Sequence, residues 1–384
     1  MRILLLGEYS NVHATLEKGL RELGHDVTLI SNGDFWKDYP RDIDLSRRSG
    51  IMGGAGYVAR LLWLLPKMRH YDVVQIINPM FLELRAAAIA PVYRYLRKNN
   101  KKLFMCAFGM DYYWVSVCCE RKPLRYSDFN IGDSLRTNAD ALSMRQDWIG
   151  TDKEKINKMI ADDCDGIIAG LYEYWVCYKD EFHNKLCYIP FPIVPKAEAT
   201  KPCHNPVRVF IGINKLRNEY KGTDIMQKAA ELVAAKHPDK MQLIKAESLP
   251  FNEYMKVMDG SDILLDQLYS YTPSMNPLEA MSRGIVCMGG GEPEHYALLG
   301  EEELRPIINV EPTIDSVVAQ LEEAVCDPDR ITLLKRQSQE YIRRHHDYLN
   351  VARQYISFWE KHPRATEQTT HDNINNTNYD NKKK

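Results

Sequence analysis

Short apolar runs alternate with longer amphipathic segments along most of the chain. The first run, Arg2–Leu6, has the length of a buried parallel strand and ends at Gly7. A polar loop and a helix to about Leu23 follow, and then a second strand at Asp26–Ser31. This order predicts a Rossmann-like βαβ unit, without the GxGxxG of a dinucleotide site. The alternation continues with strands predicted at 72–77, 103–107, 166–169 and 186–189, and helices at 57–68, 81–98, 153–161 and 171–181.

A proline-rich segment interrupts this pattern at 191–206, which we interpret as an interdomain linker. Prolines exclude regular structure there: Pro190, Pro192, Pro195, Pro202 and Pro206. The alternation then restarts, with strands at 207–212, 241–244, 262–267 and 285–288 and helices at 223–235, 251–258, 314–325 and 329–345. The sequence therefore predicts two α/β domains, 1–190 and 207–345. Two long irregular segments are predicted in the first, at 32–56 and 108–150.

The last helix is predicted within 346–363 and is amphipathic. One stripe carries Leu349, Ala352, Tyr355, Ile356 and Trp359. The apolar stripe fits two arrangements equally well: docking on its own domain, or crossing back to the first domain. The tail at 364–384 is rich in Asn, Thr and Lys and poor in apolar residues, which predicts disorder.

The composition argues against a nucleic-acid-binding protein, a cysteine metal site and a membrane span. Hydrophobic residues make up 45% of the 384 residues, and the formal net charge is −2, so the whole chain has no nucleic-acid signature. The nine cysteines show no metal-ligand spacing, and an odd number favours reduced thiols in a cytoplasmic protein. Apolar runs are too short for a signal peptide or for the ~18 residues of a membrane span.

The most informative stretch is Ser261–Tyr296. It is predicted to form strand, loop, short helix, strand and a Gly-rich turn. Asn276 suits the N-cap of the helix, Pro277 its first position and Glu279 its third, as in a capping box. A helix start at the carboxyl ends of parallel strands is an anion site, and Gly289–Gly291 would let the backbone approach a ligand.

This stretch resembles the donor-binding region of retaining GT-B glycosyltransferases of the GT4 type. The similarity lies in SMNPLEAMSRGIVCMGGGEPE, where the family has two glutamates separated by seven residues. The resemblance implies two Rossmann-like domains facing across a cleft, with the last helix crossing back. Glu279 would bind the ribose of a UDP- or GDP-sugar, and the amides of Met275, Asn276, Pro277 and Leu278 would face its diphosphate. The family's first glutamate, which contacts the transferred sugar, is replaced by Tyr271.

A basic cluster lies at the first strand–helix junction of the second domain, in GINKLRNEYKGTDIM. In the resembling family a cation followed by Lys-Gly neutralises the donor diphosphate there. Lys221 and Gly222 match, and the partner cation is either Lys215 or Arg217. A solvated basic loop is the alternative.

Candidates on the acceptor side come from the first domain. Gly7, Asn11 and His13 lie where the first strand ends, although His13 can equally be a helix residue without a catalytic role. Asp111 follows the strand where the family often has a functional histidine, so it is our candidate for orienting the acceptor hydroxyl. Tyr112 would line a sugar subsite or pack in the core. The catalytic set is therefore Asp111, His13 and Tyr271, with Asp266, Glu292 or Glu294 as substitutes for the missing carboxylate.

Three further motifs were weighed. Asp42 and Asp44 form a DxD, which we assign to a polar loop rather than a metal site. Gly50–Gly56 is interpreted as an acceptor-side loop. The segment Tyr57–His70 is basic and contains a tryptophan, so it either packs in the core or lies on an anionic membrane.

Together these features predict a metal-independent retaining glycosyltransferase without a cofactor. It would act on a glycan or lipid-linked acceptor in surface polysaccharide or glycoconjugate biosynthesis, in the cytoplasm or at the inner face of the membrane. The alternatives are a nucleotide-sugar epimerase with the GT-B fold, or a non-catalytic nucleotide-sugar-binding subunit.

Overall fold

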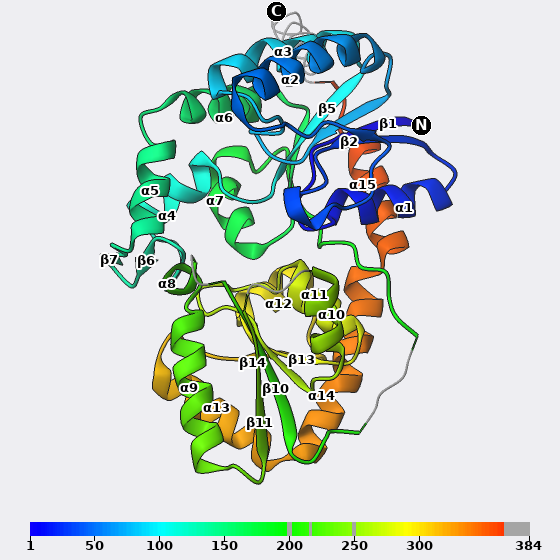
Figure 1. The fold of residues 1–384 in the computed structure, drawn as a ribbon. Coiled ribbons are helices and arrows are strands. Elements are labelled where there is room, and N and C mark those ends of the chain that lie inside the picture. Colours follow the sequence, from blue (N-terminus) through cyan, green and yellow to red (C-terminus); the bar gives the residue numbers. More distant parts are fainter. Residues whose placement is uncertain (198–201, 215–216, 248–250, 365–384) are drawn as a thin grey trace, which may run out of the picture.

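The computed structural model describes residues 1–197, 202–214, 217–247 and 251–364. The predicted donor residue Lys215 lies outside this range, as does the predicted disordered tail beyond Arg364. Figure 1 shows two α/β domains, one above the other, joined along one side by the C-terminal helices.

The N-terminal domain is built on a parallel sheet. In the described part of the chain its strand order is β3-β2-β1-β4-β5-β8-β9. The strands are apolar because helices cover both faces of the sheet, as the continuous hydrophobic runs predicted. Figure 1 shows α2, α3 and α6 above this sheet and α1 below it. The strands are β1 Arg2–Leu6, β2 Asp26–Ser31, β3 Ile43–Asp44, β4 Val73–Ile76, β5 Lys102–Ala107, β8 Gly166–Ala169 and β9 Leu186–Tyr188. The helices are α1 Val12–Glu22, α2 Gly50–Leu64, α3 Ala86–Asn99, α6 Asp152–Asp163 and α7 Tyr172–Phe182.

The C-terminal domain repeats this architecture around a smaller parallel sheet. Its order among the described strands is β11-β10-β12-β13-β14. Because every pairing is parallel, the carboxyl ends of the strands share one edge, which faces the N-terminal domain. The strands are β10 Val207–Ile213, β11 Met241–Glu247, β12 Ile263–Leu265, β13 Val286–Gly289 and β14 Ile308–Asn309. The helices are α8 Asn218–Lys221, α9 Thr223–Lys236, α10 Phe251–Asp259, α11 Met275–Ser282, α12 Pro293–Leu299, α13 Ile314–Cys326 and α14 Pro328–Tyr341.

Both segments predicted to be irregular contain regular structure, so these two predictions were wrong. In the first, a 3₁₀ turn, η1 (Phe35–Lys37), precedes β3, and α2 begins at Gly50 rather than Tyr57. Gly50–Gly56, interpreted as a loop, is the first part of this helix, and a Cβ on Gly53 would lie 2.1 Å from Arg48 O. The second contains α4 (Tyr112–Glu120), the hairpin strands β6 (Asn130–Ile131) and β7 (Ser134–Leu135), and α5 (Ala139–Trp148).

The chain crosses between the domains twice, and the two crossings lie side by side. Ile193 of the linker donates its N–H to His346 O at 2.7 Å and accepts from Tyr348 N–H at 3.0 Å. Between α14 and the last helix, Ile342–His346 forms a π-helical turn, η3. These hydrogen bonds connect the linker to the start of the last helix between the two domains.

The last helix, α15 (Tyr348–Lys361), packs on the N-terminal domain, so the crossing arrangement is confirmed. It lies against α1, where Gly19 passes so close that a Cβ would be 2.7 Å from Tyr348 O. Trp359 is fully buried there. The alternative, docking on its own domain, was wrong.

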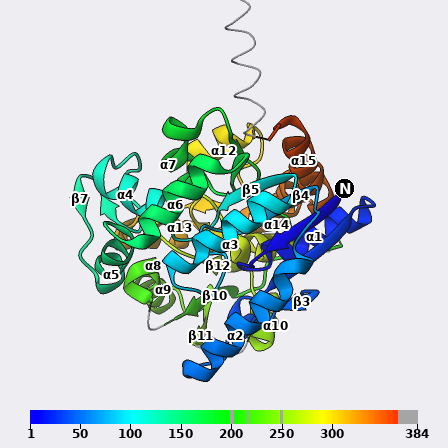
Figure 2. The same ribbon diagram turned by 90° about the horizontal axis from the view of Figure 1, so that it is seen from above.

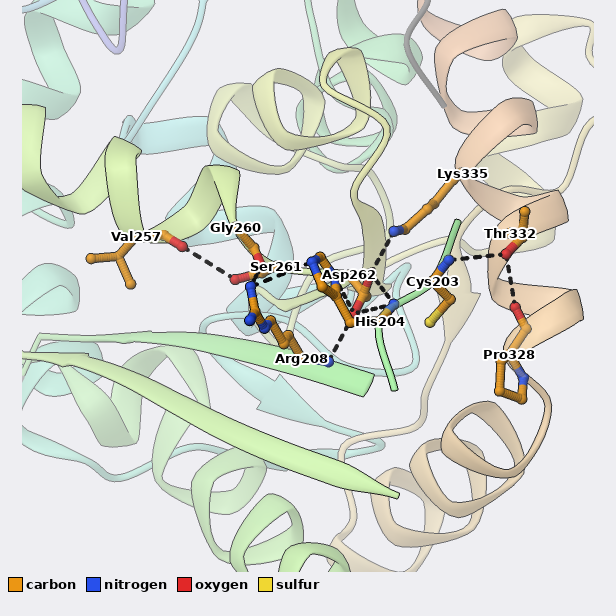
Figure 3. A network of polar contacts seen from close by, with 10 residues as sticks. All are labelled: Cys203, His204, Arg208, Val257, Gly260, Ser261, Asp262, Pro328, Thr332 and Lys335. Atoms are coloured by element: carbon orange, nitrogen blue, oxygen red, sulfur yellow. Dashed lines mark hydrogen bonds and ion pairs between the residues drawn. The ribbon is translucent and has the colours of Figure 1, made fainter. Parts of the chain in front are cut away.

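A buried ion pair holds the linker to the far edge of the C-terminal sheet (Figure 3). Asp262, fully buried just before β12, accepts from Lys335 Nζ of α14 at 2.5 Å and from Arg208 N at 2.8 Å. His204 Nδ1 lies 3.0 Å from the same carboxylate. Since Asp262 stands at the start of β12, this network lies at the opposite end of the strand from the interdomain cleft.

Candidate functional site

A cavity of about 950 Å³ lies between the domains, at the carboxyl ends of both sheets. In parallel α/β sheets this edge is where ligands bind. Its C-terminal wall includes Asn214, Lys221, Thr223, Asp266, Ser274, Met275, Asn276, Glu279 and Arg283. Its N-terminal wall includes Ser10, Asn11, Thr15, Trp36, Lys37 and Tyr39, and the linker adds Lys196.

Lys221 is the principal cation of the C-terminal wall. Burial lowers the pKa of its ammonium group, and the carboxylate of Asp266 opposes that shift. Burial likewise raises the pKa of Asp266, and Lys221 lowers it. Each charge therefore supports the other in a partly dry cleft, where a fixed cation interacts strongly with an incoming anion.

The local fold that places Lys221 depends on Gly222. This residue ends α8 and precedes α9 with φ +73°, a conformation that suits glycine. A Cβ there would lie 2.9 Å from Leu268 Cβ, and Leu268 N donates to Lys221 O at 3.0 Å. The turn thereby fixes Lys221 beside the strand end that carries Asp266. Arg217, the other predicted cation, stacks 4.7 Å from the Tyr220 ring and is not part of the cavity lining.

Helix α11 begins two residues earlier than predicted. Its N-cap is Ser274, so Asn276 is the second helical residue and the capping box predicted for Asn276 and Glu279 was wrong. Leu278 N already donates to Ser274 O at 3.1 Å, and Pro277 has no N–H. The N–H groups left for an anion at this helix start are those of Met275 and Asn276. The Asn276 side chain lies 3.4 Å from Asp266 Oδ1 and 3.2 Å from Tyr254 Oη.

Glu279 lines the cavity one turn into α11. Its Oε1 accepts from Arg283 at 2.7 Å, across one helical turn, and lies 3.5 Å from Lys196 of the linker. Arg283 and Lys196 both contact Oε1, and the Glu279 side chain is 28% exposed. Arg283 and Lys196 thus hold the Glu279 carboxylate at the cavity, where it can accept a hydrogen bond from a ligand hydroxyl.

The N-terminal wall comes from the loops after β1 and β2. Ser10 and Asn11 have φ of 53° and 73°, and Asp34, Phe35 and Asp38 also have positive φ. Asp34 links the loops, since it accepts from Ser10 N at 2.8 Å and from Lys37 Nζ at 2.6 Å. Such conformations persist only where surrounding contacts enforce them, and they cluster at functional sites.

Charged groups on each wall shift the pKa values of groups on the other wall. Lys37 is one of the charges that lower the pKa of Lys221. Burial, followed by Asp34, Glu8 and Glu279, raises the pKa of Tyr39. Lys37 and Tyr39 were not predicted from the sequence, because their segment resembled an ordinary polar loop.

Gly7 and Glu8 lie beside this wall, around a second cavity of about 90 Å³. Gly7 has φ +83°, and a Cβ there would be 2.3 Å from Ile77. Glu8 caps α1 from outside the helix, accepting from His13 N at 3.3 Å and Ala14 N at 2.8 Å. Burial raises the pKa of Glu8 to about 8, against those two hydrogen bonds.

His13 is buried away from the cavity in a continuous hydrogen-bonded chain. Gly7 O lies 2.8 Å from Nδ1 and can only accept, so Nδ1 carries the proton. Nε2 then accepts from the Gln75 amide at 3.2 Å, and Gln75 Oε1 accepts from Trp359 Nε1 at 3.0 Å. Burial lowers the pKa of His13 to about 4, which keeps the ring neutral. The chain connects the β1 loop to α15, which gives His13 a structural function.

Asp111 and Tyr112 also lie apart from the interdomain cavity lining. Asp111 is fully buried and is the N-cap of α4, accepting from Trp114 N at 2.8 Å and Tyr178 Oη at 2.8 Å. Burial raises its pKa to about 7, against those hydrogen bonds. Tyr112 lies under Lys158 Nζ, 4.5 Å from the ring centroid. These positions do not favour the acceptor functions predicted for the two residues.

Tyr271 is buried where the domains touch, outside the cavity lining. Its hydroxyl accepts from Arg125 N at 2.8 Å, and its ring stacks 5.7 Å from Tyr172. Its own N–H and that of Thr272 donate to Glu173 Oε1 at 2.5 and 3.0 Å. Tyr271 therefore connects the domains rather than presenting a hydroxyl to the cavity.

An interdomain bridge, residues 121–137, completes this contact. Arg125 pairs with Glu292 and, at 2.8 Å, with Glu294, and Tyr126 Oη also bonds Glu292. Arg136 donates to Glu219 O at 2.6 Å, next to the turn that carries Lys221. Figure 1 shows the β6–β7 hairpin of this bridge beside α8. The bridge lies within a segment predicted only as an irregular acceptor loop.

The Gly-rich turn after β13 packs against protein rather than lining the cavity. Gly289, Gly290 and Gly291 are buried, and a Cβ on Gly290 would lie 2.2 Å from Ser270 O. The turn therefore makes room for the 270–271 backbone, and the prediction that it approaches a ligand was wrong.

The two aspartates of the DxD motif form salt bridges with arginines. Asp42 accepts from Arg21 at 2.8 Å, and Asp44 pairs with Arg41 at 2.8 Å on edge strand β3. Among the described residues, no group of three or more His, Cys, Asp or Glu side chains is placed to hold a metal ion. Within the same residues, no helix has the length and apolarity needed to cross a membrane.

Solved structures of similar fold were found, whereas no protein-family model and no curated protein matches the chain. HepE from Anabaena, solved with UDP and glucose, has TM-score 0.60 and 12% identity, covering 94% of this chain and 100% of HepE. Sucrose-phosphate synthase from Thermosynechococcus elongatus has TM-score 0.58 and 11% identity, covering 94% and 99%. WaaG, a glycosyltransferase involved in lipopolysaccharide biosynthesis, has TM-score 0.51 and 12% identity, covering 92% and 98%. The chain therefore has the GT-B fold, as its sequence predicted.

Proposed function

We propose that this protein is a glycosyltransferase that moves a sugar from a nucleotide-diphosphate sugar to a glycan or lipid-linked acceptor. One observation carries the proposal. Lys221, the start of α11 and Glu279 converge on a single interdomain cavity in a GT-B fold. HepE, which has this fold, was solved with UDP-glucose, and a UDP-sugar is therefore the first donor to test.

The C-terminal wall would hold the donor. The diphosphate would lie against the Lys221 ammonium and the N–H groups of Met275 and Asn276, because all three attract an anion. Glu279 would accept hydrogen bonds from the ribose hydroxyls. Lys215 or Arg217 remains the proposed second cation, from the turn before α8.

Chemistry would then depend on leaving-group stabilisation. The bond between the sugar's anomeric carbon and the phosphate oxygen breaks, and negative charge grows on the diphosphate, where Lys221 is already placed. The acceptor oxygen forms the new bond on the same face of the sugar, and its proton passes to the departing phosphate. This retaining course, as in enzymes of the GT4 type, needs no metal and no enzyme nucleophile.

The acceptor would enter along the N-terminal wall. Asn11 is the predicted acceptor residue that lines the cavity, and Lys37 and Tyr39 join it there. Gly7 would act through the loop it starts. Of the predicted catalytic residues, Asp266 has the better position for a carboxylate near the sugar, since Tyr271 is engaged between the domains.

The direct test is turnover of UDP- and GDP-sugars by NMR, with and without simple glycan acceptors. We expect donor consumption to fall about 100-fold or more in Lys221→Ala, because an electrostatic contact to the leaving group is lost. Lys228→Ala, an exposed lysine on neighbouring α9, is the matched control and should behave like the wild type. Equal turnover by Lys221→Ala and the wild type would refute the phosphate assignment.

The same experiment separates the alternatives. An epimerase would convert the donor in the absence of any acceptor, and the NMR spectrum would show a new nucleotide sugar. A non-catalytic subunit would bind UDP or GDP and leave every donor intact. This alternative is worth testing because Tyr271 replaces the family's first glutamate.

A further inference from the structure

Helix α2 is apolar on both faces, although only one packs on the core. Tyr57, Leu61 and Leu64 are buried against the N-terminal domain. The opposite face carries large hydrophobic side chains that are strongly exposed: Ile51 93%, Met52 88%, Val58 43%, Leu62 61% and Trp63 63%. At 3.6 residues per turn Ile51, Val58 and Leu62 lie in one row, and Met52 and Trp63 lie beside it, so the five form one broad stripe along the helix. An exposed apolar stripe of this kind marks an interaction surface.

The charge of this segment points to the partner. From Leu45 to Tyr71 the chain has no Asp or Glu but five cations, Arg47, Arg48, Arg60, Lys67 and Arg69, in a protein whose net charge is −2. Arg47 and Arg48 precede the stripe, and Lys67 and Arg69 follow it, with Lys67 Nζ 3.5 Å from the centre of the exposed Trp63 ring. Arg60 lies within the helix and pairs with Asp44 at 3.5 Å. An apolar helix face with a tryptophan and with cations at both ends fits an anionic lipid surface.

The stripe lies close to the opening of the interdomain cavity. Phe35 of η1 and Tyr57 of α2 line the same small cavity, so η1 is next to α2. Phe35 and Trp36 are themselves 63% and 68% exposed, and Trp36 lines the interdomain cavity. Figure 2 shows α2 at the edge of the molecule, where neighbouring elements do not cover it.

We propose that the exposed face of α2, together with η1, is a docking surface for an anionic lipid bilayer. Ile51, Met52, Leu62 and Trp63 would enter the headgroup region, while the flanking cations contact lipid phosphates. Docking would bring the opening beside Trp36 to the bilayer. Given the proposed transferase function, the acceptor would then be a lipid-linked one, presented at the membrane surface.

The test is co-sedimentation of the full chain with vesicles of phosphatidylglycerol and phosphatidylcholine, compared with phosphatidylcholine alone. We expect binding to the anionic vesicles only, weakened by high salt because the charges are screened. Ile51→Ser/Met52→Ser/Trp63→Ser should reduce binding at least tenfold. Leu232→Ser/Leu333→Ser, which changes exposed leucines at 57% and 54% on α9 and α14, should bind like the wild type.

Charge-removing variants and a fluorescence measurement extend this test. Arg47→Gln/Arg48→Gln should weaken binding, whereas Arg353→Gln on α15 should leave it unchanged. Brominated lipids should quench tryptophan fluorescence in the wild type. Trp36→Phe/Trp63→Phe should still bind, since Phe is apolar, but lose that quenching.

The outcomes distinguish membrane docking from other partners and from the proposed function. No sedimentation with anionic vesicles, or equal sedimentation of the triple-serine variant, would overturn the proposal. Self-association that the same variant abolishes, without vesicle binding, would instead make the stripe a contact with a second copy. UDP binding in the triple-serine variant should match the wild type, so a failure of donor binding in both proteins would refute the transferase and leave the vesicle result standing.

Discussion

The two walls of the interdomain cavity are built in different ways. The C-terminal wall consists of strand ends and helix starts, where Lys221 follows a glycine turn and Glu279 projects from α11. The N-terminal wall consists of two loops with positive φ angles, connected through Asp34. The first wall is held within its own domain, by turn geometry and by the hydrogen bond from Leu268 N to Lys221 O. The second is held by contacts between its two loops and, through the β1 loop, with the last helix.

This difference explains why the two walls should respond differently to mutation. The β1 loop is connected to α15 through His13, Gln75 and Trp359, so the N-terminal wall depends on a helix near the end of the chain. The C-terminal wall is connected to the other domain at a different place, where Arg136 donates to Glu219 O beside the turn that carries Lys221. The four predictions below run from the largest expected effect to the smallest.

Trp359→Phe should destabilise the protein without affecting nucleotide binding. The change leaves Gln75 Oε1 buried without its donor and creates a small cavity, which together cost about 2 to 4 kcal/mol. Urea denaturation measures the loss, and Trp63→Phe, at a side chain 63% exposed, should change stability by less than about 0.5 kcal/mol. Unchanged stability of Trp359→Phe would mean that the buried chain does not support the N-terminal wall.

Glu279→Ala should raise the KM for the donor by about 10- to 100-fold, since a charged acceptor to the ribose is lost. The donor KM of Glu279→Gln should lie between those of Glu279→Ala and the wild type. The exposed Glu231→Ala on α9 is the control and should leave donor kinetics unchanged. If Glu279→Ala keeps the wild-type KM, its carboxylate serves only the pair with Arg283.

Glu8→Gln should change how stability depends on pH. Burial raises the pKa of Glu8 to about 8 in the folded protein, from 4.5, so the folded state holds an extra proton between these values. Its contribution is complete below pH 4.5 and is lost as pH rises through 8, by up to about 1.4 kcal/mol per pH unit. Denaturation at pH 5, 6.5 and 8 should show Glu8→Gln gaining relative to the wild type as pH rises. If the stabilities of Glu8→Gln and the wild type change with pH in the same way, the raised pKa of Glu8 is contradicted.

Tyr39→Phe should have the smallest effect, and on the acceptor alone. Loss of one hydroxyl at the N-terminal wall should raise the acceptor KM by about tenfold or less, with donor affinity unchanged. Steady-state kinetics with each substrate varied in turn measures both. A change in donor KM of the same size would show that the two walls do not divide the substrates between them.

The sequence predicted the fold well because both domains follow strong local rules. Apolar runs of strand length, separated by amphipathic helices and one proline-rich segment, leave few topologies, and the GT-B fold is confirmed. Lys221 and Glu279 were predicted, and they do line the cavity, because strand ends and helix starts can be located from local sequence.

The errors share a physical cause, since each concerns tertiary contacts. Helix α2 begins at Gly50 and Gly53 packs closely on the Arg48 backbone, while Gly290 makes room for Ser270 rather than for a ligand. The functions predicted for Asp111 and His13 stay predictions, and the structure shows both side chains bonded to buried partners. Lys37 and Tyr39 were missed because a polar loop has no periodic signal, and tertiary contacts with Ser10, from Lys37 and through Asp34, bring it to the cavity.

The central claim is that the C-terminal wall binds the nucleoside diphosphate of a sugar donor. Calorimetric titration of the wild type and Lys221→Ala with UDP, GDP and ADP tests this claim most directly. We expect at least one of the three nucleotides to bind the wild type and to lose about tenfold or more in affinity in Lys221→Ala, because a partly buried cation is removed from its phosphates. Absence of binding by all three nucleotides, or equal affinity in both proteins, would contradict the account.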